Sequence, residues 1–193
     1  MTDRIFSLAA LTVLELSPPA MVEAAARADY SHVGLRLVAA TPEEQHFPLV
    51  ADAELRRQTQ ARLRDTGIKV LDLEILRLKP ETCVADFEPI LAVGAELGGT
   101  ELLVAGNDPD EARLTERFAA LCDLAAGYGI YPHLEFMPWT DVRDLSQAMR
   151  VVANADHANG CVLVDAFHFD EALAQLGRLD ALLQRPETVA PGC

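Results

Sequence analysis

Two stretches of the sequence place ionisable side chains at the end of apolar runs. In CVLVDAFHFD, residues 161–170, the apolar run leads into Asp165, and His168 follows three positions later. In HLEFMPW, Glu135 also follows apolar residues. An unpaired carboxylate in a buried strand is strongly unfavourable, and a hard divalent cation offsets this cost because carboxylate oxygens are its natural ligands. The pattern predicts that Glu135 and Asp165 share a divalent metal ion, with His168 facing the same cavity.

Other apolar runs also carry a polar residue near their end. Arg36 lies in GLRLV and Glu74 lies in LDLEIL, and both are candidate substrate contacts. The alternative for each is a structural ion pair, and an arginine such as Arg36 or Arg77 is the alternative partner of the buried carboxylates. Asn107 and Asp108 follow ELLVAG, where such residues more often make a turn or cap a helix than touch a substrate.

Two further residues near Glu135 have a simpler interpretation. His133 precedes Glu135 by two positions and therefore shares its strand face, but it is predicted to be a core histidine with its hydrogen bonds satisfied. Trp139 follows Pro138 and is predicted to pack against neighbours, with the floor of a pocket as the alternative.

The elements that position these residues alternate between short apolar runs and longer stretches with helical spacing. The predicted strands are 4–11, 32–38, 69–76, 101–106, 131–137 and 161–167. The predicted helices lie near 19–28, 52–66, 86–97, 110–127 and 143–153. Strands that start roughly 30 residues apart are typical of successive βα units in a parallel sheet, and strands that are apolar throughout are typical of a sheet covered on both faces. The pattern predicts one α/β domain over residues 1–193.

Two features that the sequence lacks indicate whether this sheet is open or closes into a barrel. A doubly wound sheet usually carries a glycine-rich phosphate loop after its first strand, and residues 9–20 contain no glycine. A (β/α)8 barrel typically has about 250 residues, and only six βα units are visible here. The sequence therefore predicts an α/β fold of the TIM (β/α)8 type, incomplete, with about six βα units and a C-terminal helix near 171–185. Residues 171–193 are an atypical, Pro-containing tail.

Composition restricts the partners and the location. The formal net charge is −14, which argues against nucleic acid or an anionic membrane surface as a partner. The four cysteines form no CxxC pair and are predicted to be reduced thiols. The N-terminal sequence lacks the pattern of a signal peptide, and no apolar run approaches the ~20 residues that span a bilayer. A cytoplasmic protein is expected.

HLEFMPW at 133–139 and VLVDAFH at 162–168 together resemble the fifth and sixth strands of the xylose isomerase-like TIM-barrel superfamily. The resemblance spans residues 4–170. This superfamily includes sugar and sugar-phosphate isomerases and epimerases, inosose-processing enzymes, dehydroshikimate dehydratases and endonuclease IV. By resemblance, Glu135 is a metal ligand and the catalytic acid/base, Asp165 is a metal ligand, and His168 contacts the substrate. The implied cofactor is a divalent metal, Mn²⁺, Mg²⁺, Co²⁺ or Zn²⁺.

The resemblance implies an isomerase or epimerase that moves a proton next to the carbonyl of a sugar or sugar phosphate. The alternatives are a metal-dependent dehydratase of a cyclic keto acid and a non-catalytic α/β binding module on the same scaffold. An endonuclease is disfavoured by the −14 charge. The sequence departs from the family because no seventh or eighth strand, which would supply a His or Gln and a second Glu, follows His168. The open side of the barrel, between the strands at 4–11 and 161–167, is expected to cause self-association.

Overall fold

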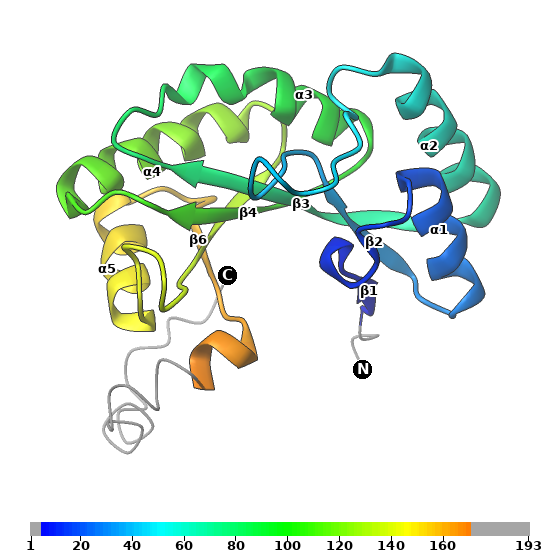
Figure 1. Ribbon diagram of the computed structural model, residues 1–193. Coiled ribbons are helices and arrows are strands. Elements are labelled where there is room, and N and C mark those ends of the chain that lie inside the picture. The colour runs from blue at the N-terminus through cyan, green and yellow to red at the C-terminus, as the bar shows by residue number, and fades with distance from the viewer. Residues whose placement is uncertain (1–4, 171–193) are drawn as a thin grey trace.

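Short runs of branched and aliphatic residues form the six parallel strands of the computed structural model, which describes residues 5–170 (Figure 1). The strands are β1 (Ser7–Leu8), β2 (His32–Arg36), β3 (Lys69–Leu78), β4 (Glu101–Gly106), β5 (Tyr131–Glu135) and β6 (Cys161–Leu163). They pair in chain order from β1 to β6, and each pair is parallel. The arrangement confirms the predicted incomplete α/β barrel. The predicted helix near 171–185 and the tail at 171–193 lie outside the described residues.

Helices follow the strands and cover the outer face of the curved sheet (Figure 1). They are α1 (Pro18–Arg27), α2 (Ala53–Thr66), α3 (Glu88–Glu96), α4 (Glu111–Ala126) and α5 (Leu145–Ala155), with 3-10 turns η1 (Ala10–Val13) and η2 (Val84–Phe87). The side chains of Asp52, Asp110 and Asp144 accept backbone N–H groups at the starts of α2, α4 and α5. Such caps satisfy donors that have no partner within the helix, which explains why these helices begin at these residues.

Two predicted strands are longer than the strands that form. The run at 4–11 contributes only Ser7–Leu8 to the sheet, because the chain turns into η1 at Ala10. The run at 161–167 contributes only Cys161–Leu163, and residues 166–170 are helical. In both cases the apolar composition is compatible with strand, but local turn formation ends the extended backbone early.

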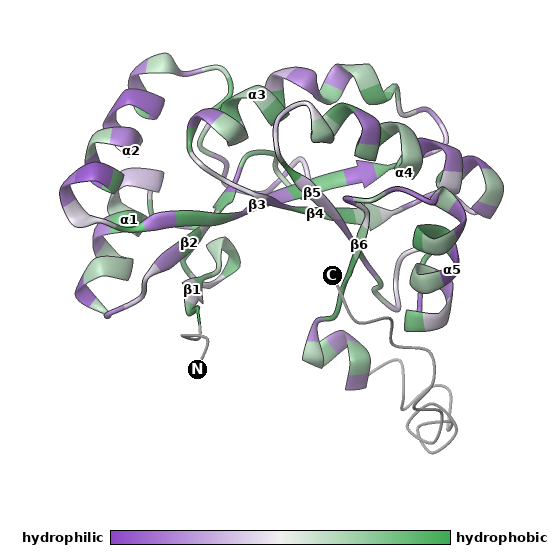
Figure 2. Ribbon diagram, turned by 180° about the vertical axis from the view of Figure 1, so that it is seen from behind, coloured by the Kyte–Doolittle hydropathy of each residue, from purple (hydrophilic) through white to green (hydrophobic). Residues whose placement is uncertain are grey.

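The main hydrophobic core fills the space between the sheet and the helices. Leu35, Leu73 and Leu134 from the strands and Phe118 and Leu121 from α4 are fully buried there. Each helix carries alternating bands of hydrophobic and hydrophilic residues, as expected for helices with one face on a core (Figure 2). A much smaller cluster is built by Ile75, Ala105 and Met137.

This smaller cluster lies on the concave face, which is otherwise rich in charge. Glu135 pairs in register with Ala105, and Ala105 pairs in register with Arg77, so the three residues share one face of the parallel sheet. The concave face at the carboxyl ends of the strands is therefore polar, and the outer face is apolar. Among the described residues, no helix is long and apolar enough to cross a membrane.

Candidate metal centre

Glu135, Asp165 and His168 lie together where β5 and β6 end. Each of the three offers a ligand atom, and these atoms lie within 4.8 Å of one another. Glu135 is the last residue of β5 and is only 5% exposed. The Nε2 atom of His168 is 3.7 Å from Oε1 of Glu135. The two carboxylates that the sequence singled out therefore face each other, and neither forms an ion pair with Arg36 or Arg77 within residues 5–170.

The position of His168 follows from a helix cap made by Asp165. Oδ1 of Asp165 accepts hydrogen bonds from the backbone N–H of Phe167 at 2.7 Å and of His168 at 3.2 Å. This cap starts the helical segment 166–170 and turns the imidazole back toward β5. Asp165 thus has a structural role through Oδ1, and it is also one of the three residues whose ligand atoms lie together.

Burial, together with the negative charges of Asp165 and Glu74, raises the pKa of Glu135 to about 7, against the opposing effect of Arg36 and Arg77. The Nδ1 atom of His168 is buried, with no hydrogen-bond partner in the described part of the chain. Crowded carboxylates beside an imidazole with an unused nitrogen suit a divalent cation, because oxygen and nitrogen donors bind Mn²⁺ and Zn²⁺ well. The residues present fit the metal that the sequence predicts.

The two predicted substrate contacts on β2 and β3 form an ion pair with each other. Nη2 of Arg36 is 3.1 Å from Oε2 of Glu74, and Nε of Arg36 is 3.4 Å from Oε1 of Glu44. Burial and the neighbouring Asp72 raise the pKa of Glu74 to about 7, against the opposing effect of Arg36. The structure thus shows the ion-pair alternative for Arg36 and Glu74. It places Glu74 close enough to act on the pKa of Glu135.

Glu44 is a residue that sequence reasoning missed. It lies in the loop between β2 and α2, where neither periodicity nor an apolar run marks a charged side chain as buried. Its contact with Arg36 becomes visible only when the loop folds back over the strand ends. The only sequence signal was the arginine itself, because a buried guanidinium requires carboxylate partners.

Asn107 and Asp108 turn out to be structural residues at the end of β4. Asp108 is buried and pairs with Arg113 at 2.6 Å and Arg117 at 2.7 Å. Hydrogen bonds and charge from Arg113 and Arg117 lower the pKa of Asp108. The Oδ1 atom of Asn107 accepts a hydrogen bond from Nη1 of Arg77 at 3.0 Å. Oδ1 of Asp108 also accepts a hydrogen bond from the backbone N–H of Asp110 at 3.0 Å, which agrees with the predicted turn.

His133 and Trp139, which lie near Glu135 in the sequence, have different surroundings. His133 is half-buried rather than in the core, and its Nε2 is 2.5 Å from Oε2 of Glu101. The prediction of a core histidine is therefore wrong in its burial, although the imidazole has a partner. Trp139 is 61% exposed, and its ring lies 4.7 Å from the His168 ring in an edge-to-face arrangement. Trp139 thus forms a rim beside the three-residue cluster.

A family model described as the xylose isomerase-like TIM barrel matches residues 22–184. No curated protein sequence matches the chain significantly. Among solved structures, the IolI protein with a bound zinc atom is similar, with a TM-score of 0.67 and 20% identity over 89% of this chain and 68% of that chain.

Two similar structures come from enzymes. One is the probable 3-DHS dehydratase AsbF of petrobactin synthesis from Bacillus anthracis, with a TM-score of 0.69 and 16% identity over 90% of this chain and 70% of that chain. The other is D-allulose 3-epimerase from Methylomonas sp. in complex with D-allulose, with a TM-score of 0.64 and 18% identity over 84% of this chain and 62% of that chain. The chain spans only 26% of a fusion protein of a xylose isomerase-like TIM barrel with 4-hydroxyphenylpyruvate dioxygenase. At these identities the similarity establishes the fold.

Proposed function

The chain belongs to the xylose isomerase-like TIM barrel family, and we propose that it is a divalent-metal-dependent isomerase or epimerase that transfers a proton next to the carbonyl of a sugar or sugar phosphate. The observation that carries this proposal is the cluster of Glu135, Asp165 and His168, whose ligand atoms lie within 4.8 Å of one another. The D-allulose epimerase and the zinc-containing IolI protein are similar in fold, which supports the same reading.

Glu135 and Asp165 would hold the metal, and the ion would polarise the substrate carbonyl and so acidify the adjacent C–H. Glu135 is the proposed acid/base, because a carboxyl group whose pKa burial raises to about 7 exchanges protons readily near neutral pH. His168 is the proposed substrate contact, since its buried Nδ1 lacks a partner within residues 5–170. Arg36 and Glu74 were both predicted as substrate contacts. In this proposal Arg36 holds Glu74 where the negative charge of Glu74 raises the pKa of Glu135. The ring of Trp139 lies edge-to-face beside the His168 ring, at the rim of the cluster.

A dehydratase acting on a cyclic keto acid is the second candidate, because it also begins with removal of a proton beside a carbonyl. The similarity in fold to the probable 3-DHS dehydratase favours it. A non-catalytic binding module on the same scaffold would have no need to hold a divalent ion. Metal binding therefore distinguishes the two enzyme hypotheses from the binding module, and the identity of the product distinguishes the epimerase from the dehydratase.

The experiment begins with Mn²⁺ titrated into the metal-free protein by calorimetry. Two carboxylates leave most of a six-coordinate shell to water, so we expect a Kd of roughly 10⁻⁴ M or weaker. Asp165→Asn should abolish binding while its side chain can still cap the helix. Asp52→Asn is the matched control, because Asp52 also caps a helix but lies outside the cluster. His168→Gln should leave Mn²⁺ affinity within a few-fold. Binding that survives Asp165→Asn would refute the site.

Activity is then tested with metal-loaded protein in D₂O. Exchange of the C–H hydrogen of D-allulose for deuterium, read by NMR, reports proton removal whichever product forms. With 3-dehydroshikimate, loss of one water, read by mass spectrometry, identifies the dehydratase instead. Glu135→Gln should abolish both readings. If Mn²⁺ binds at Asp165 but neither deuterium exchange nor loss of water is observed, the metal site is supported and these two substrates are refuted.

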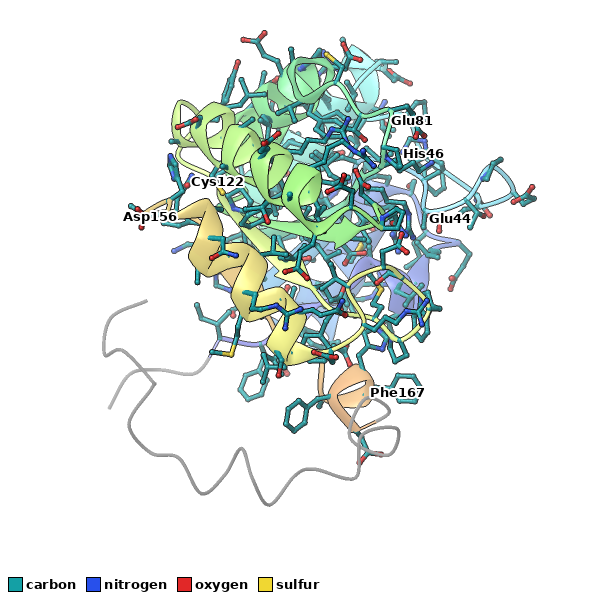
Figure 3. All side chains as sticks on the ribbon, turned by 90° about the vertical axis from the view of Figure 1, so that its left-hand side faces the viewer. Glu44, His46, Glu81, Cys122, Asp156 and Phe167 are labelled. Carbon is teal, nitrogen blue, oxygen red and sulfur yellow. The ribbon has the colours of Figure 1, made fainter. Side chains whose placement is uncertain are left out.

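We also propose self-association through the open side of the barrel and a cytoplasmic location. Phe6 and Leu11 beside β1, and Val164 and Phe167 beside β6, are exposed apolar residues at the two edges of the described sheet. Figure 3 shows Phe167 projecting outward from the helical segment that carries it. Because β1 and β6 are shorter than predicted, the association would depend more on this apolar surface than on strand pairing. The net charge of −14 and the predicted thiols support the cytoplasm.

A further inference from the structure

A cavity of about 660 Å³ lies at the carboxyl ends of β2 and β3, beside the candidate metal centre. Its walls come from the loop after β2, which carries His46, and from the loop after β3, which carries Lys79 and Glu81. Figure 3 shows His46 and Glu81 at the same end of the molecule. Ile75 lines the cavity and also belongs to the apolar cluster on the concave face. The cavity therefore borders the apolar cluster of the concave face, and Glu135 lies on that same face of the sheet.

Arg77 is the positively charged residue of this cavity that is withdrawn from solvent. Its guanidinium is half-buried, and the contact found for it is with a neutral acceptor, the amide oxygen of Asn107 at 3.0 Å. Within residues 5–170 it forms no ion pair, whereas Arg36, Arg113 and Arg117 each contact a buried carboxylate. A half-buried guanidinium without a carboxylate is unfavourable unless an anion reaches it in the working state.

A tight turn brings a second positive charge to the same wall. The backbone N–H of Lys79 donates to Oγ1 of Thr82 at 2.8 Å, and the backbone N–H of Thr82 donates back to the carbonyl of Lys79 at 3.0 Å. Pro80 occupies the second position of this turn, where its fixed φ is favourable. The turn sets Lys79 two residues beyond Arg77 at the cavity wall. The carboxylates of Glu81 and Asp86 also line the cavity. Like Lys79 they are exposed, so water screens all three charges, and Arg77 is the half-buried charge among these four residues.

The register of the sheet relates this pair of charges to the proposed acid/base. Arg77 is opposite Ala105, and Ala105 is opposite Glu135. Two strand spacings separate Arg77 from Glu135, which corresponds to roughly 10 Å between their backbones. The register also shifts between Leu73 and Leu76, and such irregularities re-aim side chains. As a result both Glu74 and Arg77, three residues apart, act on the pKa of Glu135.

We propose that Arg77 and Lys79 bind an anionic group of the substrate, a phosphate or a carboxylate, while its carbonyl lies at Glu135. This inference rests on the proposed function and narrows it to charged substrates, namely a sugar phosphate or a keto acid rather than a neutral sugar. A planar guanidinium matches the two oxygens of either group through paired hydrogen bonds. The distance between Arg77 and Glu135 suits a small substrate that carries one charged end.

The test compares matched neutral and anionic probes on metal-free protein, so that binding does not depend on the metal centre. The phosphate arm uses D-allulose and D-allulose 6-phosphate. The carboxylate arm uses 3-dehydroshikimate and its methyl ester. Calorimetry or ligand-observed NMR gives each Kd. We expect the wild-type protein to prefer at least one anionic probe by about 10-fold or more, because a hydrogen bond to a charged group contributes this much or more. The arm that shows the preference identifies the anionic group.

Arg77→Gln should reduce the preference to about 3-fold or less, and Arg77→Lys should restore part of it. Lys79→Gln, at an exposed position, should weaken the preference as well, and it decides the question if Arg77→Gln unfolds the protein. Arg64→Gln is the matched control, because Arg64 is an exposed arginine outside this cavity. A wild-type protein without preference, a preference that survives at both positions, or an equal loss in Arg64→Gln would overturn the proposal. Any of these results leaves Mn²⁺ binding at Asp165 unaffected, so the proposed function is tested separately.

Discussion

Replacing Glu135 by glutamine should stabilise the metal-free protein at alkaline pH. Burial, Asp165 and Glu74 raise the pKa of Glu135 from 4.5 to about 7 in the folded protein. The folded state therefore binds more protons than the unfolded state between pH 4.5 and 7. Its stability is full below pH 4.5 and falls as the pH rises through 7. A difference of about 2.5 pH units corresponds to roughly 3 kcal/mol of unfolding free energy that the ionised carboxylate costs above pH 7.

The assay is urea and thermal denaturation in EDTA at pH 4 and pH 8. Glutamine has the shape of glutamate without its charge, so Glu135→Gln should match the wild-type protein at pH 4. At pH 8 it should be more stable by up to roughly 3 kcal/mol, which is about 6–12 °C in Tm for a chain of this size. Glu43→Gln is the control, because Glu43 is exposed and should change little at either pH.

Mn²⁺ at about ten times its Kd should narrow the difference between the two proteins at pH 8 by about 1.4 kcal/mol. It stabilises the wild-type protein by mass action and leaves Glu135→Gln unchanged, because the variant lacks a metal ligand. The reasoning is refuted if Glu135→Gln is no more stable than the wild-type protein at pH 8. It is equally refuted if the gain is the same at pH 4, since a gain independent of pH would come from packing rather than from the charge.

Three further predictions concern packing and assembly. Asn159→Ala should lower the free energy of unfolding, measured by urea denaturation, by about 2–3 kcal/mol, because the buried Nδ2 of Asn159 donates to two backbone carbonyls at 3.0 and 3.1 Å. The control Asn154→Ala, at an exposed position, should change it little. Gly106→Ala should cost about 1–3 kcal/mol, since its added Cβ would lie 2.4 Å from Cγ2 of Val142, and the double variant with Val142→Ala should recover part of the loss. Light scattering at micromolar concentration should show self-association that Phe167→Asp reduces, and a stable monomer would contradict the open-side interface.

The fold was predictable because its signal is local and repeated. The alternation of apolar runs and amphipathic stretches located six strands and the main helices, and an Asp directly before an amphipathic stretch, as Asp110 is before α4, is a typical cap signal. Strand length was not predictable, because the backbone after Leu8 and after Leu163 leaves the sheet for local turns that apolar composition does not reveal. Propensity sets which residues accept a strand, and the sheet and its neighbours set where the strand ends.

The candidate site was predictable only where a charge interrupts a buried strand. Glu135 and Asp165 carry that signal, and they come together because parallel strands end at the same edge. Of the two partners of Arg36, Glu74 carries this signal and Glu44 does not, because Glu44 comes from a loop whose folding brings it to the arginine. That Arg77 forms no ion pair within residues 5–170 is likewise a result of folding, because the sequence near it contains several carboxylates that could have paired with it.

Strand β3 carries acidic side chains on one face, where apolar side chains would make the protein more stable. Leu73 is fully buried against the helices, whereas its neighbours Asp72 and Glu74 are acidic. Burial raises the pKa of both Asp72 and Glu74, so their ionised forms are held at a cost. Gly34 on β2 leaves the space for one of them, since a Cβ there would lie 2.3 Å from Oδ2 of Asp72. Apolar side chains at these positions would fill the same space without that cost. A concave face that gathers carboxylates beside a glycine is therefore best explained by a need for negative charge, which would serve to hold a divalent cation at Glu135 and Asp165.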